Sequence, residues 1–564
     1  MPIETNPTRR DLIVSCGSVI ATGLLPLTIG QAYAQASSVK GQVFETVNGQ
    51  RLGLARVIVT NGRECTQTNA HGFYELPIDR NCIISIVKPS GYRVAEDPLT
   101  HLPKFYYIHQ PEGTPADLKF TYEGLQPTGA LPQNVDFNLI SQAESQAFKV
   151  ILFGDPQPEN DTEVNFIRDG VIPKLIGTDA QFGITLGDIV GDDLSLYPRL
   201  SSIIGMIGIP WYQVCGNHDL NYEAKDNVFA RDTFKRHFGP SHYAFEYGNA
   251  LFVVLQNIVY HGHDPSEPDG QGTYHEELSA EQLQFAKSII ERTAEDKLIV
   301  FLCHAPLKSS KNKFGIDIAS EDTLALLSLT QNRKSISFAG HTHRMEHKYI
   351  SLPNDPFGQK SHHHHVLTTL CGSWWSGPNS PDGIAYADAC DGSPNGYYEL
   401  SIKGAEYITD FVPVSMKSEQ KMRSMLAESI AADSDHTPAY RIKSNSLLSS
   451  DLTNLHLVVN FFEGGPKTHI SYALDGRDFV ALEKKWIKDP WLKQRYSEHK
   501  GEIKPWVESV NSSHIWVGKM ANTLSPGSHK VTIKAVDEFG QETRDYVCLD
   551  VVAHNQAHLL DERR

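Results

Sequence analysis

Residues 151–160 read ILFGDPQPEN, an apolar run that stops at a glycine, an aspartate, a proline and a glutamine. In an extended chain, side chains two residues apart point to the same face, so Asp155 and Gln157 would face one side together. A carboxylate and an amide presented in this way at the end of a buried strand could hold a metal ion. Histidine is the usual second residue in sites of this sort, which makes Gln157 unusual.

Four more apolar runs of the same region end in residue types that bind metals. Side chains at strand ends are held rigidly while loops leave the site open, and ligands of α/β sheets gather at the carboxyl ends of strands. The five endings therefore predict a single site. The further runs are residues 180–193, with Asp188, Asp192 and Asp193; residues 209–219, with Asn217, His218 and Asp219; residues 297–306, with His304; and residues 335–343, with His341 and His343.

The residue types at these endings indicate which ions the site would bind. A single Gly-Asp or a single histidine after a strand is common in turns, but here the two carboxylates of Asp155 and Asp188 occur together with two amides and four imidazoles. Hard oxygen donors mixed with borderline nitrogen donors suit two divalent cations of the Mn, Fe or Zn kind. We therefore expect a dinuclear metal centre.

The order of these motifs resembles that of the calcineurin-like metallophosphoesterase superfamily. The motifs are Asp-x-Gln, Gly-Asp, Gly-Asn-His-Asp, His and Gly-His-x-His, with GNHD at 216–219 and GHTH at 340–343 as the most specific pair. Three longer stretches look like the bacterial exported subgroup, which carries an N-terminal and a C-terminal β domain. These are FGPSHYAFEYGNALFVVLQN (238–257), LCGSWWSG (370–377) and DGSPNGYYEL (391–400).

The resemblance implies a role for each ending. One metal would be held by Asp155, Gln157 and His343, the other by Asn217, His304 and His341, with Asp188 as the bridge. A metal-bound hydroxide would attack phosphorus in line, and His218 would protonate the departing alkoxide. The implied activity is metal-dependent hydrolysis of a phosphomonoester or phosphodiester.

Three residues near these motifs have more than one possible role. Gln157 either ligates the metal or hydrogen-bonds a metal-bound water. Asp219 either orients His218 or caps the segment that follows. Asp192 either supports the metal ligands by hydrogen bonding or lies in a surface turn.

Three further residues are candidates for the surroundings of the site. Asn257, at the end of the run LFVVLQN, is a candidate for supporting the ligands. Trp374 and Trp375 either line a substrate cleft or, as is more common for aromatic pairs beside a Gly-Ser turn, pack in a core.

A run of four histidines at 362–365 invites interpretation as a metal site. In a strand at most two of its side chains would converge, and the run contains no carboxylate, so a metal site is disfavoured. The run either lies near the rim of the predicted site or, as we expect, forms a solvated loop. Cys215 and Cys303 lie in apolar runs and are expected to be core residues. Cys65 with Cys82, and Cys371 with Cys390, could form disulfides in an oxidising compartment.

The pattern of apolar runs, amphipathic segments and turn signals changes twice along the chain. It therefore predicts three globular parts, as expected for 564 residues. Residues 148–400 alternate apolar runs with amphipathic helices and predict a layered α/β fold. The resemblance implies that this fold is a layered metallophosphoesterase β-sandwich flanked by helices. Residues 39–145 predict an all-β domain that resembles the carboxypeptidase-regulatory-like sandwich. Residues 401–553 predict a C-terminal immunoglobulin-like sandwich, and 554–564 a tail.

The N-terminus predicts export. Paired Arg9 and Arg10 precede an uncharged segment, and Ala32-Tyr33-Ala34 offers a cleavage site, so residues 1–34 resemble a twin-arginine signal. No later segment has the roughly 18–20 apolar residues that span a bilayer. We therefore expect a soluble periplasmic or secreted protein.

The charge and composition of the chain limit the classes of molecule that it is expected to bind. A net charge of −16, with no basic run, argues against a nucleic-acid scaffold. The expected partner is a phosphoester substrate, and the oligomeric state stays open. The alternative to an exported dinuclear-metal phosphoesterase is a catalytically decayed surface-binding protein that uses its flanking β domains.

Overall fold

The computed structural model describes residues 37–263, 272–311, 317–352 and 360–553. The predicted signal at 1–34 and the predicted tail at 554–564 lie outside these residues. Among the described residues, no helix has the length and apolar character needed to cross a membrane.

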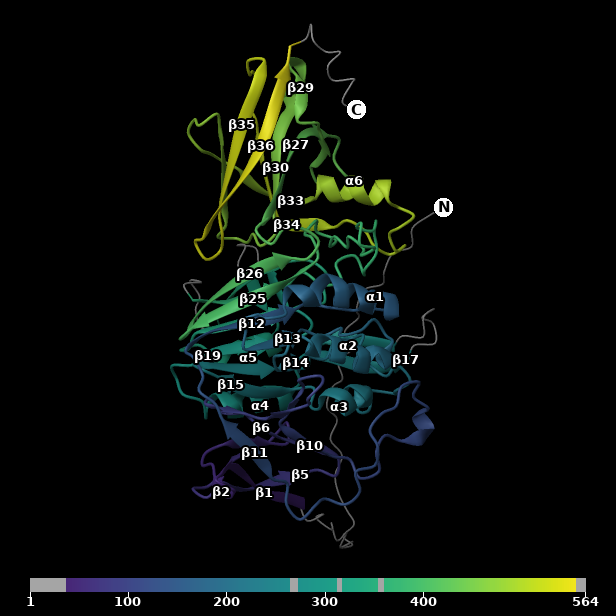
Figure 1. The fold of residues 1–564 in the computed structure, drawn as a ribbon, viewed down its shortest axis with the longest axis vertical. Coiled ribbons are helices and arrows are strands. Elements are labelled where there is room, and N and C mark those ends of the chain that lie inside the picture. The colour runs from purple at the N-terminus through teal and green to yellow at the C-terminus, as the bar shows by residue number, and fades with distance from the viewer. Residues whose placement is uncertain (1–36, 264–271, 312–316, 353–359, 554–564) are drawn as a thin grey trace, which may run out of the picture. The chain divides into compact units, whose positions relative to one another are not determined.

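Two sheets form the middle of the chain (Figure 1). The first has the order β14-β13-β12-β25-β26, and the second has the order β15-β16-β19-β22-β24-β23. The strands of the first are β12 (Ala147–Phe153), β13 (Phe182–Thr185), β14 (Trp211–Gln213), β25 (Gly396–Lys403) and β26 (Glu406–Pro413). Those of the second are β15 (Tyr243–Tyr247), β16 (Ala250–Val254), β19 (Leu298–Leu302), β22 (Ser335–Ala339), β23 (Glu346–Ser351) and β24 (Ser361–Val366). Two hairpins stand apart, β17 (Ile258–His263) with β18 (Gly272–Glu276), and β20 (Ser309–Lys311) with β21 (Asp317–Ala319).

The strands β12 and β19 bury both faces because their side chains are nearly all apolar. In β12, Val150 and Leu152 lie in the core between the sheets, whereas Ile151 and Phe153 pack on the other side with α1 and α2. The strand β19 divides in the same way, and its outer residues pack with α4 and α5. The helices are α1 (Asp161–Phe166), α2 (Tyr197–Gly205), α3 (Asp232–Phe238), α4 (Ala280–Ile290) and α5 (Glu321–Ser328). This confirms the predicted α/β fold, a β-sandwich flanked by helices.

Short helical segments lie between the main elements. They are the 3₁₀ segments η1 (Ala116–Leu118), η3 (Ile172–Lys174), η4 (Leu194–Leu196) and η5 (Ser449–Asn454), and the π segment η2 (Ile167–Val171). The segment after β12 turns directly into α1, whose N-cap Asn160 accepts a hydrogen bond from the Glu163 N–H at 3.1 Å.

The N-terminal part is all-β, as predicted. Its strands form one sheet of order β2-β1-β11-β7 with β5 beside β1, a second of order β10-β6-β3-β4, and the pair β8-β9. The strands are β1 (Ser37–Val47), β2 (Gln50–Gly53), β3 (Ile58–Thr60), β4 (Cys65–Gln67), β5 (Phe73–Ile78), β6 (Cys82–Ile86), β7 (Tyr92–Arg93), β8 (Ala95–Glu96), β9 (Pro103–Lys104), β10 (Tyr106–His109) and β11 (Phe137–Ser141). Its core is continuous with the core between the two middle sheets.

The C-terminal part is also all-β, with two five-stranded sheets that enclose a core of their own. One has the order β28-β27-β30-β34-β33 and the other β29-β36-β35-β31-β32. The elements are β27 (Met422–Ile430), β28 (Ala439–Ile442), β29 (Ser446–Leu448), β30 (Leu455–Phe461), β31 (His469–Leu474), β32 (Val480–Ala481), β33 (Glu483–Lys488), α6 (Pro490–Glu498), β34 (Asn511–Lys519), β35 (Gly527–Val536) and β36 (Glu542–Val552). The sheet that contains β12 also contains β25 and β26, so it continues to Pro413, past the boundary predicted at residue 400. The predicted domain boundaries stay predictions.

One expectation from the sequence is wrong. The histidine run forms β24, a buried strand between β22 and β23, and not a solvated loop. The two disulfides that the sequence allows are not formed, and the cysteines of the described residues are free thiols. Cys215 and Cys303 are buried in cores, as predicted.

Candidate metal centre

The predicted ligands all lie just beyond the carboxyl ends of five middle strands. Asp155 and Gln157 follow β12, Asp188 follows β13, and Asn217 follows β14. The remaining ligands are His304 after β19, and His341 and His343 after β22. The structure therefore brings these strand ends together at one edge of the paired sheets.

The ring of His304 is at the middle of one half of the cluster. Its Nε2 atom lies 2.9 Å from Asn217 Oδ1, 3.2 Å from Asp188 Oδ1 and 3.1 Å from His341 Nδ1. Its other nitrogen, Nδ1, lies 2.8 Å from the carbonyl oxygen of Leu186. If Nδ1–H donates to that carbonyl, the lone pair of Nε2 faces the cluster, as in metal-ligating histidines.

The other half is built on Asp155. Its carboxylate accepts the N–H of His341 at 2.8 Å and lies 3.5 Å from His343 Nε2. The side chain of Gln157 is beside this pair, because Cys371 Sγ lies 3.8 Å from both Gln157 Oε1 and His343 Nδ1. Whether Gln157 ligates a metal directly stays a prediction.

The backbone at these positions is strained. Asp155, Gln157, Asp188, His341 and His343 have φ angles of 32°, 40°, 45°, 73° and 51°. Side chains other than glycine rarely adopt positive φ, and such strain clusters at functional sites. The tight turns after β12, β13 and β22 thus aim their side chains at a common point at a cost in backbone energy.

Three glycines leave room for the ligands. A Cβ atom on Gly340 would lie 2.1 Å from Asp155 Oδ1, and one on Gly216 would lie 2.1 Å from Asp188 Oδ1. A Cβ atom on Gly187 would lie 2.4 Å from His304 Nδ1. Together with the mixed oxygen and nitrogen donors, this space fits divalent cations.

Burial and neighbouring charges shift the pKa values of the side chains in the cluster. Burial alone would raise the pKa of Asp188, but the imidazoles of His304 and His218 hold that pKa well below its usual value. Burial lowers the pKa of His341 to about 4 and of His343 to about 3. These two imidazoles are therefore neutral at neutral pH, the form in which histidine ligates metals.

His218 is held by Asp192, which is not adjacent in sequence. His218 Nδ1 lies 2.6 Å from Asp192 Oδ1, and the Tyr222 hydroxyl donates to the same oxygen at 2.6 Å. The other nitrogen of the ring, Nε2, lies 4.0 Å from Asp188 Oδ2. Asp192 therefore orients the ring toward the cluster.

Asp219, a candidate for orienting His218, makes its hydrogen bonds to other groups. Its carboxylate accepts the N–H groups of Gly216 at 2.8 Å and Ile189 at 3.1 Å, and the Tyr197 hydroxyl at 2.9 Å. It therefore braces the backbone of the loops that carry Asp188 and Asn217. The orienting contact to His218 comes from Asp192 instead.

The remaining candidates lie around the cluster. Asn257 makes two hydrogen bonds with the backbone of Ala305, at 2.7 and 3.2 Å, and so holds the loop of His304. Trp375 is buried and donates its indole N–H to the Pro156 carbonyl at 2.7 Å, which favours the packing interpretation. The half-buried Trp374 stacks on His343 with ring centroids 3.9 Å apart.

Sequence reasoning did not single out Tyr222, Tyr197 or Cys371 as parts of the site. Tyr222 follows His218 by four residues, but no motif marks it. Cys371 lies in the stretch LCGSWWSG and was considered only as a possible disulfide partner of Cys390.

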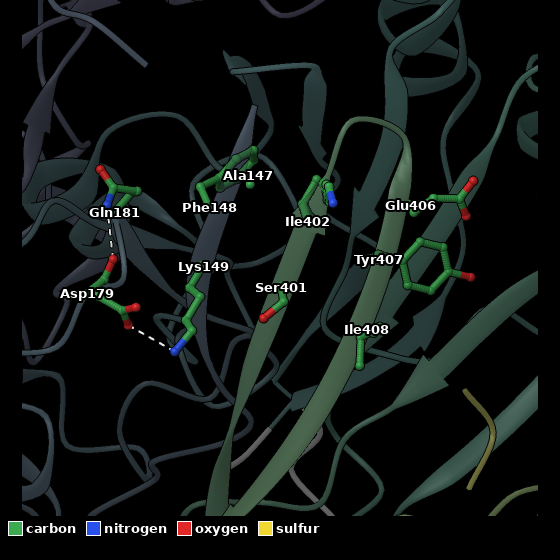
Figure 2. A pocket seen from close by; sticks show the side chains of 11 residues that line it. Ala147, Phe148, Lys149, Asp179, Gln181, Ser401, Ile402, Glu406, Tyr407 and Ile408 are labelled. Carbon is green, nitrogen blue, oxygen red and sulfur yellow. Dashed lines mark hydrogen bonds and ion pairs between the residues drawn. The ribbon is translucent and has the colours of Figure 1, made fainter. Parts of the chain in front are cut away.

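A separate cavity of about 500 Å³ lies by the start of β12, at the opposite end of that strand from Asp155 (Figure 2). Phe148, Ile402 and Tyr407 line it, and Lys149 pairs with Asp179 at its rim, 3.0 Å apart. None of the predicted metal ligands lines this cavity.

Three family models match the chain. Residues 38–125 match the N terminal of Calcineurin-like phosphoesterase, residues 148–345 match Calcineurin-like phosphoesterase, and residues 364–542 match the C terminal of Calcineurin-like phosphoesterase. A comparison with curated protein sequences gives no match.

Solved structures also resemble the chain at low identity. A dimetal phosphatase from Danio rerio is 14% identical, with a TM-score of 0.30, over 46% of this chain and 98% of that one. A purple acid phosphatase from yellow lupin (Lupinus luteus) seeds is 13% identical, with a TM-score of 0.33, over 64% of this chain and 67% of that one.

Proposed function

Because this chain belongs to the calcineurin-like phosphoesterase family and is a metal-dependent phosphoric ester hydrolase, we propose that it cleaves a phosphomonoester or phosphodiester with two divalent cations. The observation that carries the proposal is the convergence of Asp188, Asn217 and His341 on His304 Nε2, all within 3.2 Å. One carboxylate, one amide and two imidazoles this close, in a strained and glycine-lined pocket, are suited to a cation of the Mn, Fe or Zn kind.

Two groups of residues would hold the cations. Asn217, His304 and His341 would hold one cation; Asp155, His343 and Gln157 would hold the other. Asp188 lies beside His304 and would join the two. The bound cations would supply a nucleophilic water at neutral pH and neutralise charge on the phosphoryl oxygens.

His218 would provide the proton for the leaving group. If its Nδ1–H donates to Asp192, Nε2 faces the cluster and can carry the second proton of the imidazolium. Burial lowers the pKa of His218, but the carboxylates of Asp188 and Asp192 outweigh burial and raise it to about 10. The imidazole would thus be protonated near neutral pH and able to donate to a departing alkoxide, a role worth about 10²–10⁴ in rate.

A pair of variants tests this proposal. Metal-stripped protein would be reloaded with Mn²⁺, Fe²⁺ or Zn²⁺ and assayed on a chromogenic phosphomonoester and phosphodiester. His218→Asn should lose about 10²–10⁴ in kcat and keep its metal, whereas Asp188→Asn should lose both. Full activity of His218→Asn would overturn its assigned role, and hydrolysis without any cation would overturn the metal centre.

We also propose that residues 1–34 export the folded protein to the periplasm or beyond by the twin-arginine route, as Arg9, Arg10 and the Ala32-Tyr33-Ala34 site suggest. Export after folding would let the protein take up its metals in the cytoplasm. Replacing both arginines by lysine should leave the protein in the cytoplasm with its signal uncut. Normal export of that variant would contradict the proposal.

A further inference from the structure

The histidine run of β24 divides into two faces. His362 and His364 point to one side, where His362 bonds the hydroxyls of Ser335 and Ser337 at 2.8 Å, and His364 bonds that of Ser337 at 2.7 Å. His363 and His365 point to the other side. Each face of the run therefore has a different set of partners.

On the second face, His365 lies directly opposite His347 of the neighbouring strand β23. The two rings stack with centroids 3.9 Å apart. The carboxylate of Glu463, which follows β30, comes close to both rings. One ligand atom from each of the three residues lies within 4.8 Å of the other two.

This cluster is deeply buried and incompletely paired. The exposed fractions of His347, His365 and Glu463 are 5%, 0% and 8%. Among the described residues, neither ring nitrogen of His365 has a hydrogen-bond partner. Nε2 of His347 has no partner with full hydrogen-bond geometry either, although the backbone of Glu463 lies close enough to raise the pKa of that ring. Buried polar atoms are nearly always paired, because leaving them unpaired costs free energy. Three such atoms in one cluster point to a missing partner.

The pairing around the cluster orients its donors. His347 Nδ1 lies 2.9 Å from His363 Nε2, and His363 Nδ1 lies 3.0 Å from the Tyr407 hydroxyl. If each Nδ1–H donates along this chain, Nε2 of His347 presents its lone pair to the cluster. Outer partners of this kind fix the tautomer of metal-ligating histidines.

The carboxylate of Glu463 is held in the same manner. Its two oxygens accept the Thr409 hydroxyl at 2.6 Å and the Phe411 N–H at 2.8 Å, both from β26. Each oxygen keeps a further lone pair. Burial raises the pKa of Glu463 to about 8, so without a cation the group is mostly protonated at neutral pH. Burial also lowers the pKa of His347 to about 3, which leaves the ring neutral.

We propose that His347, His365 and Glu463 bind one divalent cation of the zinc class at a structural site apart from the catalytic centre. Two imidazoles and one carboxylate are a donor set that Zn²⁺ accepts, with water able to complete the coordination. The cation would ionise Glu463 and supply a partner for the unpaired ring nitrogens. It would tie β23 and β24 to β26 and to the loop after β30, and so join the middle sheets to the C-terminal part.

Zinc titration of the metal-stripped full chain tests this site, with bound zinc measured by elemental analysis and stability by thermal unfolding. One variant is His365→Phe, because the ring of His365 already packs against the rings of Tyr398 and Phe338. The other is Glu463→Gln, which keeps the shape of the carboxylate and removes its charge. His362→Gln, on the opposite face of the same strand, is the matched control. Each is made in the wild-type chain and in a chain carrying Asp188→Asn and His304→Gln, which disables the catalytic centre.

In both backgrounds, His365→Phe and Glu463→Gln should each bind about one zinc ion fewer per chain than the control. In the disabled background, zinc should raise the Tm of the control and leave that of both variants unchanged. Without zinc, His365→Phe should be as stable as the control or more so, because it removes two unpaired polar atoms. Equal zinc content in the variants and the control, or an equal zinc-dependent rise in Tm, would overturn the site and leave buried water as the missing partner.

Discussion

The Nδ1 atom of His218 lies 2.6 Å from the Asp192 carboxylate, although 25 residues separate the two in the chain. The same oxygen accepts the Tyr222 hydroxyl, so Asp192 is fixed while it fixes the ring. The adjacent Asp219 instead holds backbone N–H groups. The loop after β13 thus carries both Asp192, which positions the proposed proton donor His218, and the predicted metal ligand Asp188.

Asp192→Asn should lower kcat by about 10–100-fold, the usual loss when an outer partner of an active-site group is removed. The substitution removes a negative charge that raises the pKa of His218. A general acid works only below its pKa, so the alkaline limb of the kcat profile should move to lower pH. The measurement is the pH dependence of phosphoester hydrolysis. Asp193→Asn is the matched control, since Asp193 bonds Ser195, and a profile identical to wild type in Asp192→Asn would refute the positioning role.

Gln157→His should tighten one metal. An imidazole nitrogen is a better donor to Mn²⁺, Fe²⁺ or Zn²⁺ than a neutral amide oxygen, and the exchange leaves the charge of the site unchanged. Competition with a chelator measures the affinity of each cation. An unchanged affinity would mean that Gln157 hydrogen-bonds a metal-bound water and does not ligate.

Gly340→Ala should weaken metal binding by about 10–100-fold, because its Cβ atom would lie 2.1 Å from Asp155 Oδ1. The φ angle of Gly340 is not positive, so alanine meets no backbone strain there. The measurement is metal content after dialysis, with thermal unfolding to confirm that the chain is folded. Gly501→Ala is the control, since nothing lies within 4 Å of its Cβ position. Equal metal content in both variants would show that the Asp155 carboxylate does not need its present position.

The buried His362 should make the folded chain less stable against unfolding in acid. Burial lowers its pKa from 6.5 to about 3. Because the folded chain binds this proton less tightly than the unfolded chain, the stabilisation is fully present above pH 6.5 and falls as the pH drops toward 3. The slope is about 1.4 kcal/mol of unfolding free energy per pH unit. Denaturant unfolding at several pH values should show a shallower slope for His362→Gln than for His71→Gln, an exposed control. Equal slopes would contradict this assignment.

The sequence was sufficient to predict which side chains gather in the cluster because each follows an apolar strand, and parallel strands place their carboxyl ends at one edge of a sheet. Asp155 and His343 could therefore be assigned to one site although they are far apart in the chain. Contacts set by loop conformation could not be predicted in this way. The choice between Asp192 and Asp219 depends on the positive φ of Asp188 and Asp192, which no pattern signals.

The histidine run was misread for a related reason. Four polar side chains suggest a solvated loop, but β24 is a central strand whose backbone pairs with both neighbours. The serines of β22 satisfy one face, and the other face contacts Glu463, which has no local relation to the run. Only the tertiary fold brings these partners together.

The metal content of the catalytic cluster tests the central claim most directly. Purified full-length protein and Asp188→Asn would be dialysed, and the metal bound per chain measured together with hydrolysis of a chromogenic phosphoester. The account predicts that Asp188→Asn loses about two cations relative to wild type and loses hydrolysis with them. Equal metal content in the two proteins, or hydrolysis that survives in Asp188→Asn, would contradict a dinuclear centre joined by Asp188.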